Sequence, residues 1–266
     1  MNRLTPILEA RRDAVAAAKK RVSAADLGTR LPTTWTRRDF GVALRFPGLG
    51  VIAEVKRRSP SAGNLAAAAD AGLTACRYAE AGAAAISVLT EPNHFGGALE
   101  DLDTVREAQT TPVLRKDFIV DPYQIIEARV SGADAILLIV AAVGEALSDY
   151  LAHASETGLD ALVEVHDSAE LEIALDAGAS IIGVNNRNLA DLGVDLSVSE
   201  RLLPRIPADT VRVAESGIRR RADAERMAAA GADAILVGTS LMTAEDPATL
   251  VAAFRDCSQD LQHEAA

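Results

Sequence analysis

The sequence of 266 residues has a formal net charge of −11, with 49% apolar, 24% charged and only 3% aromatic residues. This balance is typical of a folded globular protein and excludes disordered and fibrous classes. The negative charge and the lack of a long basic run argue against nucleic-acid and anionic-membrane partners. No stretch has the pattern of a secretory leader or a membrane span, so we expect a cytoplasmic protein.

A short theme recurs along the chain, in which a helical pattern ends at a glycine and an apolar run follows almost at once. Glycine adopts the left-handed conformation that ends a helix, and the apolar run begins a strand. The repeats lie about 50 residues apart, which is enough for two β/α units each. The glycines are Gly82, Gly132, Gly178 and Gly231.

Eight apolar segments fit strands, and helical patterns such as 122–130 and 168–177 separate them. Several are nearly continuous in Ile, Val and Leu, which indicates burial on both faces of a parallel sheet. We therefore predict a (β/α)8 TIM barrel, with a doubly wound open sheet as the alternative. The predicted strands are Val51–Lys56, Ala84–Leu89, Pro112–Lys116, Asp134–Val140, Asp160–Val165, Ser180–Asn185, Thr210–Glu215 and Asp233–Gly238.

About fifty residues precede the first strand, and we call residues 1–50 the N-terminal extension. Pro6 suits the first turn of a helix, and Leu4, Ile7, Leu8 and Val15 offer it an apolar face. We expect this helix to pack on the barrel, so that residues 1–266 form one barrel domain with an additional N-terminal helical segment.

Charged side chains occur at the carboxyl ends of five of the predicted strands. An unpaired charge inside a barrel is costly, and the carboxyl-terminal face of a barrel carries its active site. We therefore predict an enzyme whose site lies at this face. The charged groups are Glu54 and Lys56, Arg115 to Asp117, Glu164, Arg187 and Glu215.

Two loops are suited to hold a phosphate. Ser216 and Gly217 follow the seventh strand, and Gly238 and Thr239 follow the eighth. Both pairs offer backbone N–H groups where barrels often bind phosphate, and the Ser59 hydroxyl is a further donor. The predicted ligand is a small anionic sugar phosphate.

Other features have plainer interpretations. Gly48 to Ala53 matches a dinucleotide-binding glycine pattern but precedes a strand instead of following one, so we reject that site. His166 is interpreted as a hydrogen-bonded loop histidine, and Asp134 and Asp233 as structural residues at strand starts. The arginines 219–221 suit the start of a solvated helix, with a position near the phosphate as the alternative, and Cys76 and Cys257 suit free thiols.

Several segments together resemble the indole-3-glycerol phosphate synthase family, in order, from about residue 4 to residue 255. The Glu-x-Lys-x-x-Ser-Pro-Ser and Lys-Asp-Phe strings are the specific ones, whereas Ala-Glu-Ser-Gly is shared more widely. The segments are Ala53–Ser61 (AEVKRRSPS), Thr90-Glu91 with Phe95-Gly96-Gly97, Val113–Phe118 (VLRKDF), Leu162–Asp167 (LVEVHD), Gly183–Leu189 (GVNNRNL) and Val213–Ile218 (VAESGI).

The resemblance implies ring closure of 1-(2-carboxyphenylamino)-1-deoxyribulose 5-phosphate to indole-3-glycerol phosphate, carbon dioxide and water, without a metal or organic cofactor. It implies that Lys116 is the general acid at the carbonyl, that Lys56 contacts the carboxylate and serves proton transfer, and that Glu164 is an acid/base group. Further implied active-site members are Glu54, Asn185, Glu215 and Arg187. The implied phosphate contacts are Ser59, Ser216, Gly217, Gly238 and Thr239, and the implied ring contacts are Phe95, Phe118, Leu137 and Leu189.

The charge state of Lys116 stays open at this stage. Burial or nearby cations would lower its pKa towards neutrality, whereas Glu54 and Glu215 would keep it charged. Two alternative functions also stay open. A phosphoribosylanthranilate isomerase would need a cysteine and an aspartate as its acid/base pair, and a non-catalytic sugar-phosphate-binding barrel would need no strand-end charges. A monomer is compatible with the sequence.

Overall fold

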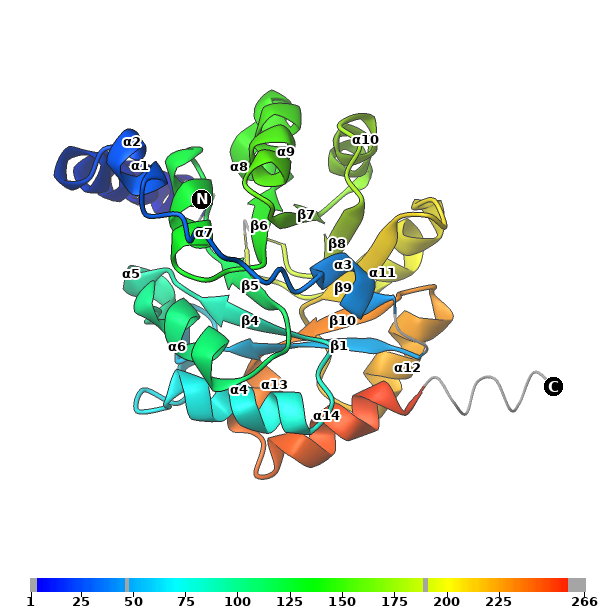
Figure 1. The fold of residues 1–266 in the computed structure, drawn as a ribbon. Coiled ribbons are helices and arrows are strands. Elements are labelled where there is room, and N and C mark those ends of the chain that lie inside the picture. Colours follow the sequence, from blue (N-terminus) through cyan, green and yellow to red (C-terminus); the bar gives the residue numbers. More distant parts are fainter. Residues whose placement is uncertain (1–3, 46–47, 189–190, 258–266) are drawn as a thin grey trace.

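The computed structural model describes residues 4–45, 48–188 and 191–257. Its centre is a closed barrel of parallel strands in the order β1-β10-β9-β8-β7-β6-β5-β4, which confirms the predicted barrel over the open sheet (Figure 1). The barrel strands are β1 (Gly50–Val55), β4 (Ala85–Leu89), β5 (Val113–Lys116), β6 (Ala135–Ile139), β7 (Asp160–Val165), β8 (Ile181–Asn185), β9 (Val211–Glu215) and β10 (Ala234–Val237). A two-stranded hairpin of β2 (Arg58–Ser59) and β3 (Gly63–Asn64) lies in the loop after β1.

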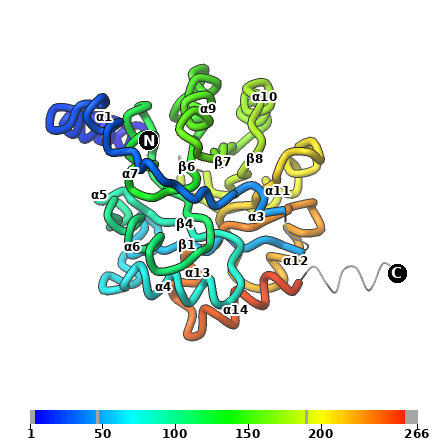
Figure 2. The backbone as a smooth tube through the Cα atoms, viewed as in Figure 1, coloured from blue at the N-terminus to red at the C-terminus, as the bar shows by residue number. Residues whose placement is uncertain are grey.

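Helices surround the barrel and alternate with its strands along the chain, as the backbone traces show (Figures 1 and 2). Within the described residues, no helix combines the length and the apolarity needed to cross a membrane. The α-helices after β1 are α4 (Ala71–Glu80), α5 (Pro92–Phe95), α6 (Glu100–Ala108), α7 (Tyr123–Val130), α8 (Val140–Val143), α9 (Leu147–Glu156), α10 (Ser168–Asp176), α11 (Ser197–Leu202), α12 (Arg221–Ala229), α13 (Thr239–Thr243) and α14 (Pro247–Arg255). Short 3-10 turns are η1 (Gly144–Ala146) and η2 (Leu203–Arg205).

The recurring glycines end helices as the sequence predicts. Gly82, Gly132, Gly178 and Gly231 have φ angles of 90°, 88°, 77° and 93°, a region that side chains with a Cβ rarely adopt. Each follows a helix and precedes a barrel strand within a few residues. The turn chemistry therefore fixes where each of these strands starts, and with it which residues reach the opposite end of the barrel.

Two apolar layers hold the barrel. The outer layer packs the helices against the outward faces of the strands, and the inner layer fills the barrel with residues such as Ile52, Leu162 and Val213. The helix α3 (Phe40–Leu44) belongs to the inner layer, because its Phe40 and Leu44 are fully buried among these side chains. It closes the amino-terminal end of the barrel, so the carboxyl-terminal end is the open one.

The rest of the N-terminal extension forms α1 (Leu4–Arg21) and α2 (Ala24–Gly28), which pack on α7. Leu4, Leu8 and Val15 are buried, as the predicted apolar face requires. Pro6 lies in the first turn of α1, where its missing N–H has no helical acceptor to lose.

The connector between α2 and α3 is clamped at the closed end of the barrel. The Trp35 ring lies between two guanidinium groups, with the Arg106 and Arg129 carbons each 3.5 Å from its centroid. Arg106 also donates to both oxygens of the buried Asp134 carboxylate, at 2.9 and 3.0 Å. Asp233 pairs with Arg212 in the same way, so both strand-start aspartates are structural.

Candidate active site

A cavity of about 1260 Å³ opens at the carboxyl ends of the strands. It brings together 15 of the 16 residues predicted for the site; Leu189 lies outside the described residues. The predicted residues that line it are Glu54, Lys56, Ser59, Phe95, Lys116, Phe118, Leu137, Glu164, Asn185, Arg187, Glu215, Ser216, Gly217, Gly238 and Thr239.

Lys116, the last residue of β5, lies at the centre of the cavity floor. Its Nζ donates to Glu215 Oε2 at 2.8 Å and to Glu164 Oε2 at 3.1 Å. Both carboxylates are almost fully buried, with side-chain exposures of 1% and 2%. The strand β5 thus places an ammonium group between a carboxylate from β7, two strands away, and a carboxylate from β9, on the opposite side of the barrel.

The environment raises the pKa values of Lys116 and Glu215 and lowers the pKa of Glu164. Burial opposes the charge of Lys116, but the attraction of Glu215, Glu164 and Glu54 outweighs it and raises the lysine pKa, so Lys116 stays protonated. Burial raises the pKa of Glu215 despite Lys116, and the neighbouring Glu164 charge adds to that rise. For Glu164, burial is outweighed by Lys116 and His166, which lower its pKa. Neighbouring carboxyls with pKa values pushed apart are typical of acid/base sites.

A second ion pair lies beside the first. Lys56 Nζ donates to Glu54 Oε1 at 2.6 Å, as expected for side chains two residues apart on one side of a strand. Gly238 makes room for this pair, since a Cβ at Gly238 would collide with Glu54 Oε1 and approach Lys56 Nζ to 2.9 Å. A glycine predicted only for phosphate binding therefore also accommodates two charged side chains.

Gly183 on β8 makes the same kind of room for Glu215, whose Oε1 occupies the space of the absent Cβ. We expect Gly183→Ala to push this carboxylate away from Lys116 and to lower kcat about 10- to 100-fold, because misplacing a reacting group by an ångström has such an effect. Steady-state kinetics of the folded variant check this prediction. Gly28→Ala is the matched control, because nothing lies within 4 Å of its added Cβ; equal activity of the two variants would contradict the prediction.

The predicted phosphate loops lie side by side. Ser216 and Gly217 follow each other with φ angles of 66° and 85°, which for serine is an unusual, strained conformation. The Ser240 hydroxyl donates to Ile218 O at 2.9 Å and so joins the loop after β10 to the loop after β9. Ser59 is buried and accepts from Ala62 N at 3.1 Å within the β2–β3 hairpin.

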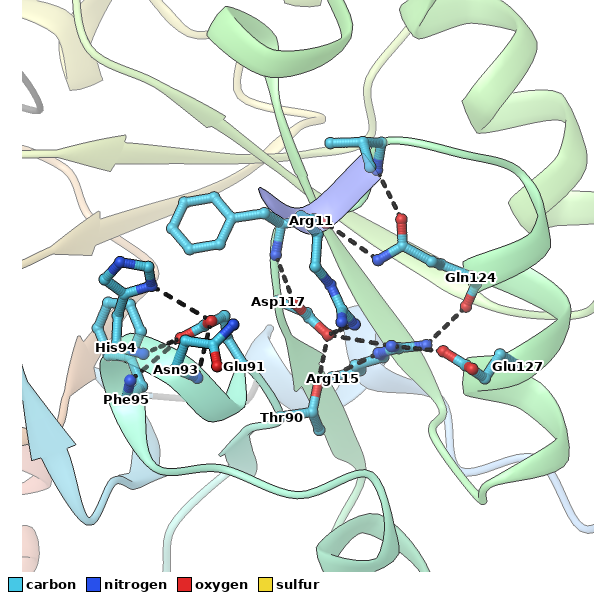
Figure 3. Close-up of polar contacts among 12 residues, drawn as sticks. Arg11, Thr90, Glu91, Asn93, His94, Phe95, Arg115, Asp117, Gln124 and Glu127 are labelled. Atoms are coloured by element: carbon cyan, nitrogen blue, oxygen red, sulfur yellow. Dashed lines mark hydrogen bonds and ion pairs between the residues drawn. The ribbon is translucent and has the colours of Figure 1, made fainter. Parts of the chain in front are cut away.

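Apolar side chains form another wall of the cavity. The rings of Phe95 and Phe118 have centroids 6.2 Å apart and an interplanar angle of 45°, and Leu137 lies on the floor. Glu91 fixes Phe95, because its carboxylate accepts from the backbone N–H groups of α5, including Phe95 N at 3.1 Å (Figure 3).

The residues on either side of Lys116, Arg115 and Asp117, belong to a buried polar network (Figure 3). Asp117 Oδ2 accepts from Arg11 at 2.5 Å, Thr90 at 2.7 Å and Arg115 at 3.0 Å. Fully buried Arg115 also donates to Glu127 at 2.7 Å. This network, the Asp117 network, ties β5 to α1 and α7, so the N-terminal extension helps to fix the strand that carries Lys116.

Further cations lie at the cavity mouth. Burial and the nearby Arg219 lower the pKa of Arg187, whose guanidinium donates to Leu192 O at 2.9 Å. Arg219 also lines the cavity, next to the predicted phosphate loop after β9, which agrees with the second of its two interpretations. Arg187 and Arg219, together with Lys56 and Lys116, place positive charge where an anionic ligand would enter. A chain of net charge −11 needs such a local cluster of cations to attract an anion.

Sequence reasoning missed two kinds of residue. Leu4, Pro6 and Ile7 of the N-terminal extension line the cavity, which no local pattern indicates. His166 is a hydrogen-bonded loop histidine as expected, but its ring also lies 3.3 Å from Glu164. Its position two residues after Glu164 was the available signal.

No group of three or more His, Cys, Asp and Glu side chains in the described segments is arranged to hold a metal ion. Cys76 and Cys257 are both free thiols, as expected. The Cys76 thiol donates to Ala108 O at 2.9 Å, between α4 and the end of α6 and away from the cavity.

A closed parallel barrel with acid/base groups at its carboxyl-terminal face defines a TIM-barrel enzyme. The family model "Indole-3-glycerol phosphate synthase" matches residues 4–254. Curated relatives named as such include those of Parafrankia sp. (50% identical, covering 95% of this chain and 94% of the relative) and Mycolicibacterium gilvum (52% identical, covering 94% and 92%). The chain belongs to the indole-3-glycerol phosphate synthase family, whose members are carboxy-lyases of tryptophan biosynthesis.

Solved structures support the fold at much lower identity. The 3-hexulose-6-phosphate synthase of Salmonella typhimurium has a TM-score of 0.66 at 17% identity, covering 81% of this chain and 100% of that one. A thiamine phosphate pyrophosphorylase from Pyrococcus furiosus has a TM-score of 0.62 at 19% identity, covering 82% and 98%.

Proposed function

We propose that the cavity converts 1-(2-carboxyphenylamino)-1-deoxyribulose 5-phosphate to indole-3-glycerol phosphate, and that Lys116 is its principal proton donor. The observation that carries the proposal is the Lys116 ammonium held between Glu164 and Glu215 on the cavity floor, 3.1 and 2.8 Å respectively from their nearest oxygens. Family membership indicates which reaction takes place. The geometry supports it, because a charged proton donor lies beside two carboxylates with which it can exchange protons.

In the first step an aromatic carbon attacks the ketone carbon, and the carbonyl oxygen takes a proton from Lys116. The bond to the carboxylate then breaks, its electron pair returns to the ring, and carbon dioxide leaves. One proton is consumed up to this point. Glu215, which is hydrogen-bonded to Lys116 and has a raised pKa, is placed to return that proton to the lysine.

Dehydration needs an acid for the hydroxyl and a base for a proton of the new five-membered ring. Glu164 suits the base, because Lys116 and His166 outweigh its burial and keep it ionised. Lys56 suits the acid, and before decarboxylation its ammonium suits the contact with the carboxylate that is lost. Glu54, 2.6 Å from Lys56, holds it in place, and Asn185 supports the floor between β7 and β9.

We assign binding of the phosphate and the aromatic ring to opposite walls of the cavity. Ser59 and the loops after β9 and β10 hold the phosphate, supported by the strained Ser216 and by the bond that joins the two loops. The aromatic ring lies against Phe95, Phe118 and Leu137. Leu189 stays a prediction, and Arg187 faces the anionic groups.

We also propose that the chain acts as one barrel domain with the N-terminal extension as part of its site. Arg11 reaches Asp117 across 106 positions of sequence, and Leu4, Pro6 and Ile7 contribute to the cavity wall. We further propose that the protein acts as a monomer in the cytoplasm. Its only partner in this proposal is the small sugar-phosphate substrate, with no nucleic acid and no membrane.

The test is an assay of the purified protein in EDTA, with no added metal or nucleotide. We expect it to convert the carboxyphenylamino sugar phosphate to a product with indole fluorescence, and we expect inorganic phosphate to compete with the substrate. Folded protein that forms no product would overturn the proposed reaction. Inhibition that excess substrate does not relieve would overturn the phosphate assignment alone.

The isomerase alternative lacks its acid/base pair in this cavity. Cys76 lies on α4 with its thiol bonded to Ala108 O, and Cys257 lies in the outer layer beside α14. Neither thiol can therefore reach a ligand held over Lys116.

A further inference from the structure

The loop between β7 and α10 places an imidazole against one oxygen of Glu164. His166 Nε2 lies 3.3 Å from Glu164 Oε1, whereas the other oxygen, Oε2, accepts from Lys116 Nζ at 3.1 Å. The His166 side chain is 14% exposed and is not among the described residues that line the cavity. Glu164 is therefore held at both oxygens, one by a group inside the cavity and one by a group behind it.

His166 is itself fixed from the other side. Glu170 Oε2 lies 2.9 Å from His166 Nδ1 and accepts from the His166 backbone N–H at 2.7 Å. Glu170 lies in the first turn of α10, where Asp167 Oδ1 accepts from its N–H at 2.9 Å. The ring is thus anchored at the backbone, at Nδ1 and at the helix start, and has little freedom to turn away from Glu164.

A carboxylate at each ring nitrogen favours the doubly protonated imidazolium, because both nitrogens then donate. Burial opposes this charge, but the hydrogen bonds and charges of Glu164 and Glu170 outweigh it and raise the pKa of His166 to about 10. Nε2 is buried and makes no well-aligned hydrogen bond, so we treat its contact with Glu164 as an ion pair. Such contacts are often long in a free enzyme and tighten when a ligand binds.

We propose that His166 is a positioning residue that, anchored on Glu170, orients the Glu164 carboxylate and keeps it ionised for proton transfer. The proposal rests on the role proposed for Glu164. It predicts an effect on kcat and little on KM, because His166 is not among the described residues that line the cavity and so is not placed to bind the substrate directly.

The first test compares His166→Ala with His166→Gln. Gln can place its amide nitrogen near the position of Nε2, so it can restore a donor to Glu164 without the charge. We expect His166→Ala to lower kcat about 10- to 100-fold with KM changed less than about threefold, and we expect His166→Gln to regain part of that loss. His153→Ala is the matched control, since that exposed ring on α9 lies outside the cavity lining, with its Nδ1 2.7 Å from Asp149 O, and it should keep full activity. Unchanged kcat in a folded His166→Ala would overturn the proposal.

A double-mutant cycle with Glu164→Gln separates this inference from the proposed function. If His166 acts through Glu164, His166→Ala should lower kcat no further in the Glu164→Gln background. If Glu164→Gln alone leaves kcat unchanged, the proposed role of Glu164 fails. If Glu164→Gln lowers kcat, and the double variant loses the product of the two single-variant losses, only the inference about His166 fails.

The pH dependence of kcat gives a readout that a purely structural role would not move. The groups facing Glu164 are Lys116 from β5, His166 from its own loop, Asn185 from β8 and, through Lys116, Glu215 from β9. Removing the imidazolium removes a cation that lowers the Glu164 pKa, so the acidic limb of kcat should move to higher pH by about one unit. An unmoved limb in His166→Ala would contradict the proposal.

Discussion

Lys116→Met should leave a folded barrel with kcat reduced by about a hundredfold to ten-thousandfold, the range expected when a general acid is lost. Methionine keeps the length of the side chain but has no proton to donate. The neighbouring Glu164 and Glu215 then lose the cation between them, and their mutual repulsion should make one of them take up a proton. Initial rates of indole fluorescence, with circular dichroism to confirm folding, measure the effect.

Lys19→Met is the matched control for this substitution. Lys19 is also in an ion pair, with Asp121 at 2.8 Å, but its side chain is 43% exposed on α1. We expect this variant to keep the activity of the unmodified protein. Undiminished activity in Lys116→Met would remove the lysine from the proposed mechanism.

Asp117→Ala should lower the free energy of unfolding by about 3–5 kcal/mol, because it breaks a buried ion pair and leaves its partner charges behind. The carboxylate is fully buried and accepts from Arg11, Thr90, Arg115 and the Phe118 N–H. Glu127 remains to pair with Arg115, which keeps the expected loss within this range. Urea unfolding followed by circular dichroism measures the change.

An exposed ion pair provides the comparison. Glu172 lies 3.4 Å from Arg205, and their side chains are 69% and 45% exposed. Glu172→Gln should change the free energy of unfolding by less than about 1 kcal/mol, since water already screens this pair. If the two substitutions had equal effects, the Asp117 network would not stabilise the fold as argued.

The barrel could be predicted because its signals are local. The predicted strand 160–165 matches β7 at both ends, and the others differ by a residue or so at an end, as for 51–56 against β1 at Gly50–Val55. A glycine with positive φ ends a helix and an apolar run starts a strand, and neither signal depends on the position of distant parts of the chain. The carboxyl end of each strand then follows from where the strand starts and how long it is. Lys116, Glu164 and Glu215 lie at such ends, and all three line one cavity.

What the sequence could not provide depends on closure of the barrel. The pairing of Arg11 with Asp117 and the room that Gly183 leaves for Glu215 join residues that only the fold brings together. The sequence alone does not decide the charge of Lys116, because burial and nearby carboxylates shift its pKa in opposite directions. The positions of Glu215, Glu164 and Glu54 around Lys116 in the fold decide the outcome: the attraction of these carboxylates outweighs burial and raises the lysine pKa.

The clamp around Trp35 gives the protein a single intrinsic tryptophan signal at a defined place in the fold. Trp35 is the only tryptophan in the sequence, and it lies between Arg106 and Arg129 at the closed end of the barrel, opposite the cavity. Its emission should therefore report whether the connector has docked and should ignore what occupies the site. An indole product carries the same chromophore, so refolding should be followed by Trp35 emission before substrate is added, and turnover afterwards by the rise in indole emission.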